Sequence, residues 1–153
     1  MAKLDLSLAP EELDRFLTDQ RTVRLATASP DGRPHVVPLW FVWVDGTMFM
    51  NSTLGNVTIR NIQHNPIATG SVDDGFGYDE LRGVLVQGRV EWAEQDPRLE
   101  TVMHRWSDKY MGGNPLPYSR WKDRVWLRLI PRQVTSWDFR KISSAKAKVK
   151  QDE

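Results

Sequence analysis

The 153-residue chain contains no cysteine, which excludes a disulfide framework, a thiolate metal site and thiol catalysis. Histidine is also scarce, and His35, His64 and His104 lie too far apart in sequence to fit a metal-ligand spacing. We therefore expect no metal site. The lack of cysteine also makes the cytoplasm the expected location.

Long hydrophobic runs and a strong charge imbalance are missing too. The longest mainly apolar stretch, residues 35–44, is too short to cross a bilayer and contains Pro38. No basic-then-apolar segment resembling a signal peptide opens the chain. Lysine and arginine total 21 against 20 acidic residues, a net charge of +1, whereas general nucleic-acid binders are usually much more basic. We expect neither a membrane nor a nucleic-acid partner.

Motifs of common enzyme classes are absent as well. The chain has no Walker phosphate-binding loop, no G-x-S-x-G nucleophile motif and no H-E-x-x-H zinc motif. Asp73 and Asp74 are adjacent carboxylates, but acids followed by Gly75 are typical of a turn. Classical acid–base or nucleophilic catalysis is therefore not indicated.

Alternating hydrophobic residues and two Asp-Gly turns predict an antiparallel meander. Pro38 inside the second strand indicates an edge, a bulge or a backbone contact, and Gly88 indicates a bulge or bend. We expect a corner at Pro131 between the last two strands. The predicted strands are 22–28, 35–44, 47–52, 67–72, 83–92, 124–130 and 134–139.

Three helices and a polar tail complete the expected organisation. Apolar spacing and Pro10, Asn56 and Pro97 near helix starts predict helices over 10–20, 56–64 and 96–110. Residues 143–153 are rich in lysine and nearly free of large apolar side chains, so we expect them to be disordered or a loose arm. The chain is expected to form one mainly β domain, residues 1–142, with a β-barrel and flanking helices.

The order of features along the chain is more specific than any single motif. The strand over 24–27 leads through Asp-Gly to His35-Val-Val-Pro-Leu-Trp40, and a second Asp-Gly turn precedes Asn51-Ser-Thr53, Arg60-Asn-Ile62 and Asn65-Pro66. This order resembles the pyridoxamine 5'-phosphate oxidase-like family of split β-barrel flavin and deazaflavin proteins, over about residues 8–142. Segments 73–83 and 136–141 are most similar to the actinobacterial flavin/deazaflavin oxidoreductases of the B group.

The resemblance implies an FMN-binding-type split barrel that forms a homodimer, with a cofactor site at each interface. The cofactor would be coenzyme F420 or, alternatively, FMN. Its ring would lie over residues 35–40, its phosphate near the start of the helix over 56–64, and residues 76 and 78 would close over the ring from the other subunit. The implied cofactor-binding residues are His35, Pro38, Leu39, Trp40, Asn51, Ser52, Thr53, Val57, Thr58, Arg60, Asn61, Phe76, Tyr78, Trp137, Arg140 and Lys141.

One position departs from the family pattern. Members usually carry a basic residue, most often lysine, two positions before the residue matched by Arg60, and here that position is Thr58. Purely structural roles also stay open: surface ion pairing for Arg60, packing for Trp137, loop anchoring for Tyr78 and a helix-internal hydrogen bond for Asn61.

Three functions follow from these features. The first is an F420-dependent reductase that transfers a hydride to a small conjugated organic molecule. The second is an FMN-dependent oxidoreductase of the same fold. The third is a non-catalytic barrel that binds a deazaflavin, a flavin, haem or a fatty acid, which the missing lysine favours.

Overall fold

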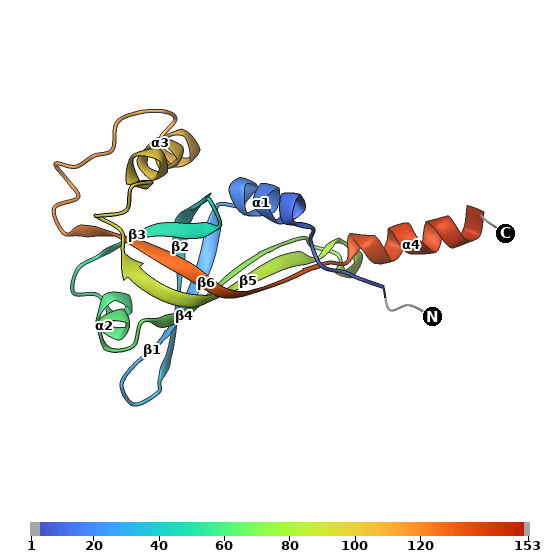
Figure 1. Ribbon diagram of the computed structural model, residues 1–153, viewed down its shortest axis with the longest axis horizontal. Helices are drawn as coiled ribbons and strands as arrows, with labels where there is room; N and C mark the ends of the chain where they lie inside the picture. The colour runs from blue at the N-terminus through green and yellow to red at the C-terminus, as the bar shows by residue number, and fades with distance from the viewer. Residues whose placement is uncertain (1–3, 152–153) are drawn as a thin grey trace.

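Six antiparallel strands close into a barrel in the computed structural model, which describes residues 4–151, with side chains as far as Ala147. The order around the barrel is β1-β2-β3-β6-β5-β4 (Figure 1). This confirms the predicted mainly β barrel with flanking helices. The strands are β1 (Thr22–Ala28), β2 (Pro34–Val44), β3 (Thr47–Thr53), β4 (Ile67–Asp74), β5 (Arg82–Trp92) and β6 (Arg124–Asp138).

The helices lie outside the barrel. The first and second, α1 (Pro10–Asp19) and α2 (Val57–His64), agree with the predicted segments to within a residue, whereas α3 (Leu99–Tyr110) begins three residues later than expected. A short 3₁₀ turn, η1 (Tyr78–Glu80), connects β4 to β5. None of the helices in residues 4–151 is long and apolar enough to span a bilayer.

The expected corner at Pro131 is wrong, because β6 runs as one strand through it. The ladder between β5 and β6 instead contains a bulge at Gln87/Gly88, as predicted for Gly88, and Gly88 lies opposite Pro131. Proline has no N–H to give to a ladder, so it fits where the pairing shifts. A Cβ on Gly88 would lie 1.9 Å from the Ile130 carbonyl oxygen, so only glycine allows this approach.

The tail, which was expected to be disordered or a loose arm, is an α-helix over its described residues. Helix α4 (Arg140–Gln151) contains most of the Lys-rich segment and projects away from the barrel (Figure 1). Alanine and lysine are good helix formers, which explains why a segment with few large apolar residues is helical. Its first turn is attached to α1, because Lys141 Nζ donates to Glu12 Oε2 at 2.8 Å. Residues 152–153 lie outside the described part.

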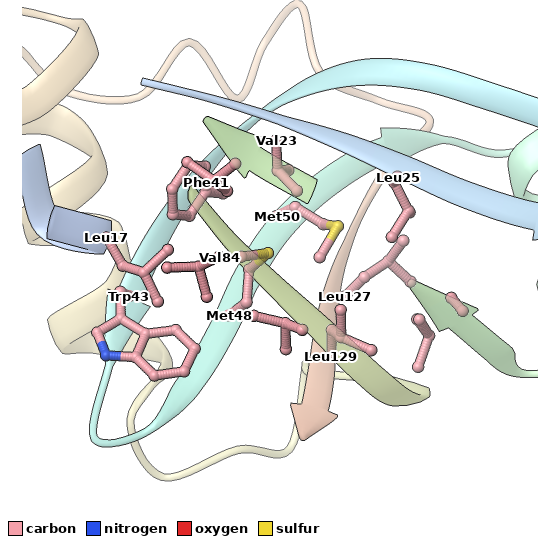
Figure 2. Packing of buried hydrophobic residues seen from close by; sticks show 14 of the residues in the cluster. Leu17, Val23, Leu25, Phe41, Trp43, Met48, Met50, Val84, Leu127 and Leu129 are labelled. Atoms are coloured by element: carbon pink, nitrogen blue, oxygen red, sulfur yellow. The ribbon is translucent and has the colours of Figure 1, made fainter. Parts of the chain in front are cut away.

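Two clusters of buried side chains form the core. The barrel interior is filled by residues such as Leu25, Met50 and Leu127, and Leu17 of α1 joins them at one end (Figure 2). A second cluster between the outer face of the barrel and α3 includes Phe49, Trp106 and Trp126. Because α3 covers only the second half of β2, residues 41–44 are buried, whereas exposed residues alternate over 34–40.

A buried carboxylate connects the start of α3 to the barrel. The Asp96 side chain is completely buried; its Oδ2 accepts hydrogen bonds from Arg98 Nη2 at 2.8 Å and from Arg128 Nη1 at 2.6 Å. Arg128 also donates to Glu91 Oε2 at 2.7 Å. The hydrogen bonds from Arg98 are the largest cause that holds the pKa of Asp96 far below its usual range, so this carboxylate is charged in the folded protein.

We predict that Asp96→Asn lowers the free energy of unfolding by about 3–5 kcal/mol, because it leaves two arginines without their buried partner. The pKa of Asp96 is lower in the folded protein than in the unfolded chain. This stabilisation is therefore fully present above about pH 4, the pKa of an unfolded aspartate, and it is lost as the pH falls below that value. Urea unfolding across this pH range measures both effects. Asp31→Asn, at an exposed turn, is the control, and equal stability of the two variants would contradict the role of Asp96.

Candidate cofactor site

The first group of expected site residues surrounds a hollow of about 430 Å³ beside the turn between β1 and β2. His35, Val57, Arg60 and Asn61 all line it, so the structure brings these four together. The other lining residues are Ser29, Pro30, Arg33 and Pro34.

Two guanidinium groups give this hollow its positive charge. Arg60 is exposed, and its Nη1 donates to the Gly55 carbonyl oxygen at 2.6 Å. Arg33 was not among the site residues predicted from the sequence. It follows the turn at Asp31-Gly32, and only the folded chain brings it beside Arg60 of α2. Its only ion pair among the described residues is an exposed one to Asp31 at 3.4 Å. Both arginines therefore retain donors for an anion.

The position of the missing lysine faces the protein interior. Thr58 is 2% exposed and lies in the first turn of α2. Asn61, one turn later, is also buried and donates from Nδ2 to Thr27 Oγ1 at 3.1 Å, so α2 is fastened to β1. This contact is a structural role for Asn61 in addition to its place in the hollow. Position 58 therefore does not contribute a charge to the hollow, whose two cations are Arg33 and Arg60.

The segment before α2 provides a helix cap. Asn56 accepts from the Ile59 amide at Oδ1, at 2.9 Å, and donates from Nδ2 to Ser52 Oγ at 2.8 Å. Ser52 is buried and orients this cap, whereas Thr53 is exposed. Of the two hydroxyls expected to meet a phosphate, Thr53 is thus the accessible one.

Asn51 is buried on the neighbouring strand β3. Its Oδ1 accepts from Arg124 Nη1 at 2.9 Å, but its buried Nδ2 has no hydrogen-bond partner among the described residues. A buried amide donor without a partner costs free energy. A ligand group reaching Asn51 would remove this cost.

The outer face of β2 carries an exposed apolar stripe that starts at the hollow. Pro34, Val36, Pro38 and Trp40 alternate with inward-facing residues, and Val36 is 60% exposed. Pro38 lies opposite Arg24 in an unbroken ladder, so it marks no bulge. Because β2 pairs with β3 only from Phe41 onward, Pro38 lies on an open edge, one of the predicted alternatives. Leu39 faces inward and packs against the core, so its side chain is not on the stripe.

Trp40 is the last residue of this stripe, and its side chain is held in place by Tyr110. Its ring stacks on Tyr110 with centroids 4.4 Å apart and planes 4° apart. The Tyr110 hydroxyl is fixed in turn, because it donates to the Phe41 carbonyl oxygen at 2.6 Å and accepts from the Phe41 amide at 3.0 Å. Burial raises the pKa of Tyr110 to about 12, so the hydroxyl stays protonated at neutral pH.

The remaining expected residues lie elsewhere, around the β4–β5 connection and the start of α4. Phe76 and Arg140 line a second hollow of about 580 Å³. Phe76 is fully exposed, and Tyr78 packs at 5.1 Å on the Phe139 ring. The register places this group at the other end of β1 from His35, because β1 pairs with β4 so that residues 73–74 extend past its start.

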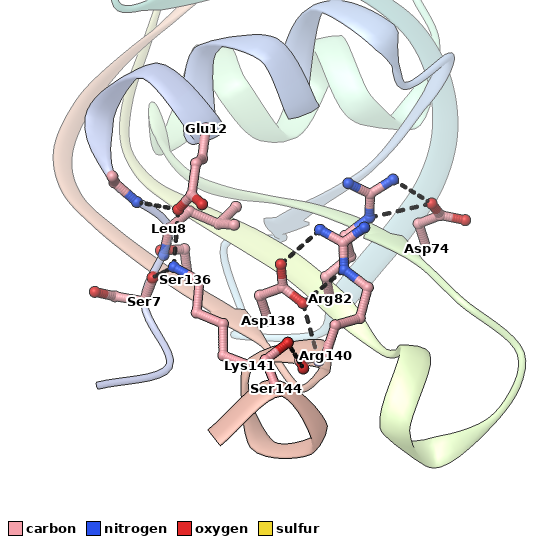
Figure 3. Close-up of polar contacts among 11 residues, drawn as sticks. Ser7, Leu8, Glu12, Asp74, Arg82, Ser136, Asp138, Arg140, Lys141 and Ser144 are labelled. Carbon is pink, nitrogen blue, oxygen red and sulfur yellow. Dashed lines mark hydrogen bonds and ion pairs between the residues drawn. The ribbon is translucent and has the colours of Figure 1, made fainter. Parts of the chain in front are cut away.

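The charged members of this second group are already paired. Arg140 donates to Asp138 Oδ2 at 2.6 Å, and Arg82 donates to Asp74 Oδ2 at 2.9 Å (Figure 3). The hydrogen bonds from these arginines lower the pKa of each carboxyl. Lys141 donates to the Ser7 carbonyl oxygen at 2.6 Å. Arg140 and Lys141 therefore already have partners within the chain.

Trp137 packs on the backbone of β5. It lies opposite Gly83, and a Cβ on Gly83 would lie 2.3 Å from the indole Cζ2. This contact confirms that Trp137 has a packing role and leaves its cofactor contact as a prediction. No group of three or more metal-ligating side chains occurs in the described residues.

Comparison with known proteins places this geometry in context. The family model described as pyridoxamine 5'-phosphate oxidase matches residues 9–138. The conserved hypothetical protein Rv2991 from Mycobacterium tuberculosis is 28% identical, with a TM-score of 0.81 over 94% of this chain and 92% of that one. No curated protein matches the sequence.

Two other solved structures are similar over most of both chains. A protein described as an F420 reductase is 28% identical, with a TM-score of 0.65 over 83% of this chain and 98% of that one. An FAD-binding protein from Mesorhizobium loti is 25% identical, with a TM-score of 0.66 over 85% and 94%.

We predict that Gly83→Ala displaces the Trp137 indole and lowers the free energy of unfolding by about 1–3 kcal/mol through overpacking. The indole N–H resonance of Trp137 should shift in a ¹H–¹⁵N spectrum, while those of the barrel tryptophans stay in place. Gly77→Ala is the matched control, because Gly77 has φ −77° and a Cβ there would meet only side-chain atoms. An unchanged Trp137 resonance would disprove the packing.

Proposed function

This chain belongs to the pyridoxamine 5'-phosphate oxidase family, and from that premise we propose that it is an F420-dependent reductase. Its substrate would be a small conjugated organic molecule, and its subgroup the actinobacterial flavin/deazaflavin oxidoreductases. The observation that carries the proposal is the hollow with Arg33 and Arg60, which adjoins the apolar stripe of β2 through Pro34. An anion site beside a flat apolar surface suits a planar ring with a phosphate tail. The similarity to an F420 reductase supports the choice of cofactor.

The protein's part in the reaction is to bind and orient. Arg33 and Arg60 would hold the phosphate, and Val57, the first residue of α2, lines the same hollow, so the helix N-terminus would add to the site. Val36 and Pro38 would support the ring, and Trp40, fixed by Tyr110, would limit its position at the far end. When bound, reduced F420 supplies the hydride, so no side-chain nucleophile is required.

A homodimer would join the two separated groups of residues. Val36 is 60% exposed, and Trp40 is 46% exposed although it stacks on Tyr110 of α3; Phe76 is fully exposed. Exposed apolar residues on an uncovered sheet face are typical of an interface. We propose that the stripe faces a second copy of the chain, and that Phe76 and Tyr78 of one protomer close over the ring held by the other.

We predict that the double variant Arg33→Gln/Arg60→Gln binds F420 about 100-fold more weakly, because it removes two charge-assisted contacts to phosphate. Fluorescence titration with F420 measures the change. The control is Arg89→Gln/Arg132→Gln, which removes two exposed arginines beside a different hollow and should bind normally. This pair tests the phosphate site more directly than Thr58→Lys, because position 58 is buried.

The same titration distinguishes the cofactors. Binding of F420 at micromolar concentration, with FMN much weaker, supports the proposal. A preference for FMN would contradict F420 and assign the chain to the flavin-dependent members. If neither binds at about 100 μM, a net affinity weaker than about −5.5 kcal/mol, the redox proposal fails and a non-catalytic ligand-binding role replaces it.

We also predict that Val36→Lys converts the dimer to a monomer, because a charge in the centre of an apolar interface must be desolvated. Sedimentation velocity measures the change in mass. Tyr118→Lys replaces an exposed aromatic residue on the loop before β6 and should leave the dimer intact. A wild-type protein that sediments as a monomer at micromolar concentration would refute the dimer while leaving the cofactor titration interpretable.

A further inference from the structure

A cavity of about 540 Å³ lies between α1, β2 and α3, and none of its residues belongs to the candidate cofactor site. This size is within the usual range of about 300–1,000 Å³ for small-molecule pockets. The lining combines the edge of β2 with two cations and one acid: Thr18, Val42, Trp43, Arg105, Asp108 and Lys109.

Arg105 and Lys109 lie at this cavity because β2 extends beyond the end of β1. The β1–β2 ladder ends at the pair Thr22 and Trp40, so the backbone of β2 beyond Trp40 has no strand on that side. Side chains of α3 replace the missing strand. Lys109 Nζ donates to the Phe41 carbonyl oxygen at 3.1 Å, and Arg105 Nη1 donates to the Trp43 carbonyl oxygen at 2.9 Å. Each cation uses one donor in this contact and retains others.

Lys109 has no anionic partner within the described part of the chain. Its Nζ lies 4.4 Å from the centre of the Phe41 ring, and no carboxylate of the described residues lies within 4.0 Å of it. Burial lowers the pKa of Lys109 to about 8, with a further contribution from the positive charge of Arg21, while Asp19 opposes the shift. A half-buried ammonium without a counter-ion is stabilised by any anion that enters beside it.

The other charged groups around the cavity set the charge of the ligand. Arg105 is the second cation of the lining, and Asp108 is its one acid. Tyr110 stays neutral because burial raises its pKa to about 12. Two cations against one carboxylate in the lining favour a single negative charge. Two further acids disfavour a dianion: Asp19, and Asp14, whose Oδ1 accepts from Trp43 Nε1 at 2.7 Å. Val42 and Trp43, which are 2% and 6% exposed, bound the cavity along the edge of β2, and the rest of the molecule would lie beside this edge.

We propose that this cavity is a second small-molecule site, which binds a small organic monocarboxylate. The carboxylate lies between Lys109 and Arg105, and the body of the molecule lies along the edge of β2. This site is independent of the cofactor site, because it shares no residue with it and its occupancy requires neither F420 nor FMN.

The test uses calorimetric titration of the wild-type protein with 2-naphthoate and with its uncharged analogue 2-naphthamide at about pH 6.5, where Lys109 is protonated. We expect the carboxylate to bind at least about tenfold more tightly than the amide, as for a charge-assisted contact. Lys109→Met should abolish this preference while keeping the apolar stem of the side chain. Lys122→Met, at an exposed lysine, is the matched control and should retain the preference.

The pH dependence gives a second readout. Because the bound carboxylate requires the ammonium form of Lys109, the preference should fall about tenfold between pH 7 and pH 9. Binding near pH 8 should take up protons, so its heat should depend on the ionisation enthalpy of the buffer. Arg105→Gln should reduce the preference in part, and it replaces Lys109→Met if that variant does not fold. Equal affinity for the two compounds, or a preference that survives loss of Lys109, would overturn the proposal.

Discussion

The unequal lengths of β1 and β2 determine much of this molecule. β2 has eleven residues and β1 has seven, so the pairing between them ends at Trp40 and the last part of β2 needs another cover. Helix α3 covers both the outer face and the unpaired edge of this part of β2. Its apolar face packs on Phe49 and Trp126, and its polar residues bond to the exposed edge of β2. Closing the barrel alone would have left this edge open to pairing with another chain. The first half of β2 keeps an exposed outer face.

This division separates the two surfaces on which ligands are proposed. The uncovered half of β2 carries an apolar stripe next to a hollow with two arginines, and the covered half borders a cavity with an unpaired lysine. Trp40 lies at the boundary, where Tyr110 connects them: its ring supports the exposed indole, and its hydroxyl satisfies the backbone of Phe41. A single aromatic residue of α3 therefore contributes to the geometry of both surfaces.

In the candidate site, the cations come from other positions than the one expected from the family pattern. In sequence, Thr58 indicates a phosphate site without its main cation. In the structure this position is buried, and Arg33 reaches the same hollow from the β1–β2 turn, beside Arg60 of α2. The hollow therefore carries two cations, and one of them, Arg33, is more than twenty positions from Thr58 in the chain. Conversely, Arg140 and Lys141 are basic residues of the expected set that already have anionic or carbonyl partners within the protomer.

Local signals in the sequence predicted most of the elements. The alternation of apolar residues, the Asp-Gly turns and the helix starts placed the first five strands and the first three helices to within a few residues, but they divided β6 into two strands. The order of those elements also indicated the family and four residues that line one hollow: His35, Val57, Arg60 and Asn61. The remaining features depend on contacts that form only in the tertiary structure. The run of β6 through Pro131 depends on a bulge in another strand, and the helical tail is held by Glu12 from the opposite end of the chain. The roles of Arg33 and Lys109 depend on which distant segments lie beside them. Such contacts join residues far apart in sequence, so no local pattern encodes them.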